Sequence, residues 1–80
     1  MPSEPVPLSS LALGARAAIT EIKVAAGSRG RLMEMGLLGG TTVELVRFAP
    51  LGDPVEIKVR GYHLTLRRHE ADLILVHPQP

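Results

Sequence analysis

Two short runs in which apolar and polar residues alternate place the tightest limit on how this chain folds. One covers 55–60, with valine or isoleucine at each odd position and a charged residue at each even position. The other covers 63–67 and follows a Gly61-Tyr62 turn. Successive side chains of a strand point to opposite faces, so each run predicts a strand with one buried face.

Three further segments read as strands, at 17–22, 42–48 and 73–76, and residues 68–71 read as one helical turn. Five short strands with tight glycine turns predict a mostly β fold, a small SH3-like five-stranded barrel with one inserted α-helix. With one Phe, one Tyr and no Trp, its core must be aliphatic. The residues expected inside are Val43, Leu45, Val55, Ile57, Val59, Leu64, Leu66 and Ile74, with Leu32 and Met35 over one opening.

The inserted helix is expected over 28–37. Ser28 is the expected N-cap, because its hydroxyl can accept a hydrogen bond from a free N–H of the first turn. Gly36 suits the left-handed position after the helix, and Leu37 would then pack back on Leu32 in a Schellman motif.

Eighty residues form one domain. We assign 8–76 to it, with a flexible proline-rich lead-in at 1–7 and a flexible tail at 77–80. The chain has no cysteine, no signal-peptide pattern and no apolar run long enough to span a bilayer, which predicts a soluble cytoplasmic protein without membrane insertion. The net charge of +1 and the shortage of aromatic residues disfavour nucleic acid as a partner.

The sequence lacks the constellations that carry catalysis or bind cofactors. No serine lies in a nucleophile-elbow context, and the glycines at 36–40 are not followed by the Lys-Ser/Thr of a phosphate loop. The histidines at 63, 69 and 77 lack metal-ligand spacing, although His69 with Glu70 or Asp72 could form a weak site. We therefore predict no enzyme activity, no cofactor and no tight metal site.

The segment RFAPLGDPVEIKVRG, Arg47 to Gly61, contains a loop with Leu51 near its tip between two prolines. Leu51 either folds back to close the barrel or contacts a partner. If Val43 and Leu45 face the core, simple alternation puts Phe48 on the opposite face, either as local cover or as part of a binding patch. The prolines stiffen the loop, which favours a patch. Its expected residues are Leu38, Phe48, Pro50 and Leu51, with a charged rim of Arg47, Lys58 and Arg60.

From about Leu8 to Val76 the chain resembles the ferrous iron transport protein A (FeoA) family, and the Ala49–Pro54 stretch APLGDP with the later Arg60-Gly61-Tyr62 is the most specific part. Gly39 departs from the family pattern. The other matching segments are Leu11 to Gly14, Ala18-Ile19, Arg31-Leu32, Met35-Gly36-Leu37, Gly40-Thr41, Leu66-Arg67 and Glu70-Ala71.

The resemblance implies a non-enzymatic cytoplasmic accessory protein of ferrous iron uptake that binds and modulates the FeoB-type membrane iron transporter. Weak self-association stays open. An alternative is the SH3-like module of an iron-responsive transcriptional regulator, because related domains occur at the C-terminus of some such repressors. The lack of a DNA-reading helix in these residues counts against that alternative.

Overall fold

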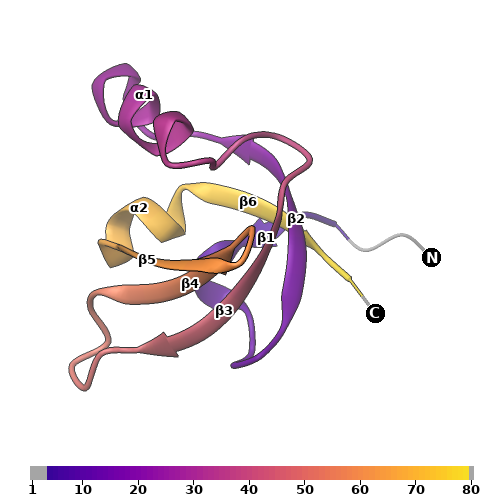
Figure 1. Ribbon diagram of the computed structural model, residues 1–80, viewed down its shortest axis with the longest axis vertical. Coiled ribbons are helices and arrows are strands. Elements are labelled where there is room, and N and C mark those ends of the chain that lie inside the picture. The colour runs from indigo at the N-terminus through magenta and orange to yellow at the C-terminus, as the bar shows by residue number, and fades with distance from the viewer. Residues whose placement is uncertain (1–3, 80) are drawn as a thin grey trace.

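The computed structural model describes residues 4–79 and contains one antiparallel sheet of six strands in the order β1-β6-β2-β3-β4-β5 (Figure 1). Neighbours in the sheet are mostly neighbours in sequence, except that the last strand lies between the first two. No helix in the described part of the chain is long and apolar enough to cross a membrane. The elements are β1 Val6–Pro7, the 3-10 helix η1 Leu8–Ser10, β2 Arg16–Ile22, α1 Ala26–Glu34, β3 Thr42–Phe48, β4 Val55–Val59, β5 Tyr62–Leu66, α2 Arg68–Asp72 and β6 Ile74–Pro78.

The sheet has one strand more than the five predicted from sequence. Val6 pairs with Val76 and Pro7 with Leu75, so the end of the expected lead-in belongs to the sheet as β1. β6 likewise continues to Pro78, into the expected tail. Pro7 is tolerated because β1 is an edge strand, and Pro78 is tolerated because it is the last residue of β6 and lies beyond the stretch that pairs with β1. Residues 1–3 of the lead-in and residue 80 of the tail lie outside the described residues.

The core is aliphatic, as predicted. Of the eight residues expected inside, all but Leu64 are buried; Leu64 and Met35 are half-buried against the core. Leu32 of α1 is fully buried. In β4 the three odd-numbered residues are buried, which confirms the predicted register of this strand. The sixteen buried apolar residues are Leu8, Leu11, Ala17, Ile19, Val24, Leu32, Leu37, Val43, Leu45, Val55, Ile57, Val59, Leu66, Ala71, Ile74 and Val76.

Helix α1 begins two residues before the predicted start. Ala25 is its N-cap, and Ser28 lies in the first turn without capping it, so the predicted cap is wrong. The predicted helix end is confirmed. The Leu37 N–H donates to the Leu32 carbonyl at 3.0 Å and the Gly36 N–H to the Met33 carbonyl at 3.0 Å. Gly36 has φ +96°, and this pair of bonds is a Schellman motif.

A β-bulge in β3 reverses the expected orientation of Phe48. Leu45 pairs with Ile57, but Arg47 pairs with Glu56, so Val46 is an extra residue between them. Phe48 is therefore opposite the buried Val55 and packs against the core. Placing Phe48 outside the core from simple alternation was wrong, because one inserted residue moves every later side chain to the other face.

Candidate functional site

The loop between β3 and β4, residues 49–54, presents Leu51 to solvent; we call it the hairpin tip. The Ala49 N–H donates to the Pro54 carbonyl at 2.9 Å, and the Gly52 N–H donates to the Ala49 carbonyl at 2.7 Å. Gly52 has φ +86°, a conformation that favours glycine. The Leu51 side chain is 96% exposed. Leu51 therefore does not fold back onto the barrel.

The hairpin tip is held against the start of α2. The backbone N–H of Arg68 donates to Asp53 Oδ1 at 3.0 Å, and the Arg68 guanidinium lies over the Phe48 ring, 5.4 Å from its centroid. A Cβ added at Gly52 would lie 3.0 Å from Arg68 Nη1, so the loop packs closely on this side chain. These contacts fix the base of the loop and leave Leu51 free.

The residues predicted to form one patch lie in two places. Phe48, Pro50 and Leu51 lie at or beside the hairpin tip, whereas Leu38 precedes the other end of β3. Seven residues of strand separate these ends by about 20 Å. Placing Leu38 beside Leu51 was therefore wrong, and a single contiguous patch is excluded. Arg47 stays at the tip end, while Lys58 and Arg60 lie with Leu38.

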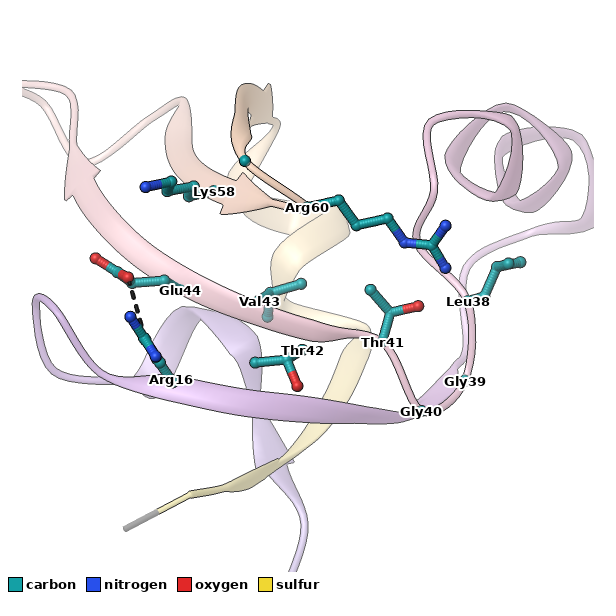
Figure 2. Close-up of a pocket in the computed structure, with 11 residues that line it drawn as sticks. Arg16, Leu38, Gly39, Gly40, Thr41, Thr42, Val43, Glu44, Lys58 and Arg60 are labelled. Atoms are coloured by element: carbon teal, nitrogen blue, oxygen red, sulfur yellow. Dashed lines mark hydrogen bonds and ion pairs between the residues drawn. The ribbon is translucent and has the colours of Figure 1, made fainter.

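Leu38, Lys58 and Arg60 line a groove of about 590 Å³, which we call the basic groove (Figure 2). It lies between the loop after α1, the start of β3 and the end of β4. Its charged residues are three cations and one carboxylate, and Arg16 Nε lies 3.4 Å from Glu44 Oε1. The full lining is Arg16, Leu38, Gly39, Gly40, Thr41, Thr42, Val43, Glu44, Lys58, Arg60 and Gly61.

Sequence reasoning missed Arg16 and Glu44 in this groove and Arg68 beneath the hairpin tip. Arg16 comes beside β3 because Arg16 pairs with Glu44 in the sheet. That register follows from the whole sheet order, so no local pattern in the sequence indicates it. For the groove itself, the sequence did offer one signal, the Gly39-Gly40 pair, since two glycines in a loop leave backbone accessible.

Arg47 and His63 flank the Glu56 carboxylate on the outer face of the sheet. Arg47 Nε donates to Glu56 Oε1 at 2.8 Å, and His63 Nδ1 lies 2.7 Å from Glu56 Oε2. The hydrogen bond from His63, followed by that from Arg47, lowers the pKa of Glu56 from its ordinary value. Arg47 is therefore already paired within the sheet.

The two carboxylates considered with His69 for a weak metal site are bonded to other partners. Glu70 is 5% exposed, and its carboxylate accepts hydrogen bonds from the Arg31 guanidinium and, at 3.2 Å, from the Arg67 N–H. The Asp72 carboxylate accepts from the Ser9 hydroxyl. Within residues 4–79, no three His, Asp or Glu side chains are grouped so that they could share a metal ion.

Comparison with solved structures identifies the fold class. Over 94% of this chain and 71% of the other, the structure matches the FeoA protein from Chlorobium tepidum with a TM-score of 0.90 and 44% identity. It also matches a manganese-dependent transcriptional repressor, with a TM-score of 0.84 over 96% of this chain and 38% of that one, but at 14% identity this shows the fold alone. The fold class is thus a small, mostly β domain of the SH3-like type, as predicted.

The sequence comparisons are more specific. Residues 6–78 match the profile of the FeoA domain, and the chain belongs to this family, which is associated with ferrous iron transport. A curated relative is the Fe(2+) transport protein A/Fe(2+) transporter FeoB fusion protein of Porphyromonas gingivalis, 39% identical over 69 residues. The match covers 86% of this chain but only 8% of that protein.

Proposed function

We propose that this chain is a non-enzymatic accessory protein of ferrous iron uptake that binds the cytosolic part of a FeoB-type transporter in the cytoplasm and modulates it. The observation that carries the proposal is the Porphyromonas gingivalis relative, in which the two named proteins are fused in one polypeptide. Proteins joined in this way commonly act on a shared process, and a free domain of the same family then needs a surface that binds its partner.

The hairpin tip is the surface that we assign to this contact. Leu51 is almost fully exposed, and the loop that carries it is fixed by Asp53 and Arg68. A pre-ordered loop loses little conformational entropy on docking, so more of the free energy of burying Leu51 contributes to affinity. Pro50 is also exposed and extends the apolar surface, and the Arg47 guanidinium beside it stays largely exposed although it pairs with Glu56.

The alternative expectation, a module of an iron-responsive regulator, is supported by likeness of fold to metal-dependent regulators such as the repressor of which this chain spans 38%. That likeness carries no residue-level argument at 14% identity.

The test is a calorimetric titration of the purified chain with the cytosolic part of the FeoB-type transporter from the same organism. We expect saturable binding at a fixed stoichiometry. In cells, deletion of the gene should change the rate of ferrous iron uptake, and the wild-type chain should restore it. Absence of binding both to the cytosolic part and to the full transporter in detergent would refute the proposed partner.

A further inference from the structure

The basic groove carries positive charge that the fold does not use. Arg16 is paired with Glu44, but Lys58 and Arg60 form no ion pair within 4.0 Å in the part of the chain that the structure describes. Both side chains belong to exposed residues. The groove therefore has two cations available to an external anionic group.

Arg60 is also an unfavourable choice for its backbone conformation. Arg60 and Gly61 form the two-residue link between Val59 and Tyr62, which are paired, and their φ angles are +50° and +87°. Hairpin links with two positive φ angles favour Asn-Gly, whereas a long side chain at the first position is strained. Figure 2 shows the Arg60 guanidinium extended toward Leu38 across the groove. Arginine at this position forms no ion pair in the described part of the chain and has a strained backbone, and strained residues of this kind cluster at sites that contact ligands.

Gly39 is a second indication that the basic groove contacts another molecule. It has no positive φ, and a Cβ built on it would meet nothing within 4 Å. Neither backbone conformation nor packing requires glycine at this position. A bare backbone beside the groove does allow another chain to approach closely.

The arrangement of the cations identifies the kind of ligand. In Figure 2, Lys58 and Arg60 point away from each other, so they do not converge on one small anion. Arg60 lies in the turn after β4 and points away from Lys58, so the two charged ends lie farther apart than neighbouring side chains on one face of a strand, which are about 7 Å apart. An extended peptide can span such a distance, because it presents a row of side chains on one face. The groove-lining residues include no aromatic side chain on which a base could stack, and they do include Glu44, which disfavours nucleic acid.

We propose that the basic groove binds an extended acidic segment of a protein partner. Carboxylates on one face of that segment pair with Lys58 and Arg60, and an apolar side chain beside them contacts Leu38. This inference rests on the proposed function only in taking the segment to belong to the transporter. The groove's preference for an acidic peptide is testable without the transporter.

The direct test is an NMR titration of the isotope-labelled full chain with a blocked nine-residue peptide that alternates glutamate and threonine. The same peptide with glutamine in place of glutamate is the control, and an eight-nucleotide oligothymidylate is the third probe. We expect the glutamate peptide alone to shift the amide signals of 39–43 and 58–61, with affinity that falls as salt rises. Lys58→Gln and Arg60→Asn should each weaken binding about two- to five-fold.

Matched variants separate the groove from general effects. Lys23→Gln removes one exposed positive charge outside the groove and should leave the affinity unchanged. Gly39→Leu should keep the fold, because an added Cβ meets nothing within 4 Å, and should weaken binding, because it puts a bulky side chain on backbone that lines the groove. Arg60→Asn should raise the thermal unfolding midpoint by a few degrees while it weakens binding. An arginine needed for stability would instead give a lower midpoint, which overturns the argument.

Three results would each overturn the proposal. The glutamine peptide could bind as tightly as the glutamate peptide, the signal changes could lie away from the groove, or the oligonucleotide could bind more tightly at the same residues. The outcome also separates this inference from the proposed function. If the transporter's cytosolic part binds wild type, Lys58→Gln and Arg60→Asn equally and the peptide does not bind, the groove proposal fails alone. If the peptide binds as expected and the transporter does not, the assigned partner is wrong.

Discussion

Replacing Leu51 by Asp tests the hairpin tip directly. The wild-type side chain is 96% exposed, so the substitution removes almost no buried surface from the folded protein. Exposed substitutions of this kind change the free energy of unfolding by less than about 0.5 kcal/mol. For a domain of this size, that is a shift of at most about 2–4 °C in the thermal unfolding midpoint.

The effect on binding should be much larger. Full burial of a leucine side chain in an interface contributes about 1.5–3 kcal/mol, which corresponds to a weakening of about ten- to 150-fold when the side chain is lost. Aspartate adds the cost of burying a charge. We therefore expect Leu51→Asp to lower the affinity for the transporter's cytosolic part by at least about tenfold in calorimetry.

Leu13→Asp is the matched control, because Leu13 is also exposed, at 65%, but lies in the turn before β2. It adds the same charge and should leave the affinity nearly unchanged. An affinity of Leu51→Asp within twofold of wild type would show that the hairpin tip is not the contact. A fall of more than about 10 °C in the midpoint, well beyond the range for exposed sites, would refute the reasoning from exposure.

Three further predictions concern stability. Ile57→Ala should cost about 2–5 kcal/mol in urea unfolding, because Ile57 is fully buried; a cost below about 1 kcal/mol would contradict the register of β4. Gly30→Ala should stabilise the domain by about 0.5–1 kcal/mol, since Gly30 lies within α1 and an added Cβ meets nothing within 4 Å; a lower midpoint would contradict this. The pKa of Glu56 is lowered in the fold, so its contribution to stability is present above about pH 4.5 and is lost as the pH falls through the lowered pKa. Glu56→Gln should therefore lose less stability than wild type in thermal melts between pH 5 and pH 3, both values approximate, and parallel losses would refute the role of this pair.

The parts of this fold that depend on short-range patterns could be predicted from the sequence. The alternation at 55–60 predicted the buried face of β4, because each residue's orientation follows from its neighbour's. The Schellman motif that ends α1, with Gly36 just after the C-cap, was predictable for a similar reason, since it involves residues within about one turn. The exposed Leu51 was recognised because prolines and a glycine act locally on the loop.

Features that depend on distant residues were not predictable in this way. The extra residue Val46 in β3 is a property of the pairing with β4, and alternation alone placed Phe48 on the wrong face. Glu70 is buried and its carboxylate is paired with Arg31, thirty-nine positions earlier, which no local pattern indicates. Leu38 was placed with Leu51 although the strand predicted at 42–48 lies between them, so the sequence already contained the information that separates the two residues.

The pairing of β1 with β6 has a consequence for how such a domain can be linked to another protein. Val6 and Val76 are paired, and in Figure 1 the start of β1 and the end of β6 lie on the side of the molecule away from the hairpin tip. A linker at either end therefore leaves the tip accessible. Short flexible linkers give effective concentrations in the millimolar range. A contact with a dissociation constant of about 100 μM would then be about nine-tenths occupied in a fused protein. A chain that diffuses freely lacks this advantage, so the affinity of its own surface must supply the difference.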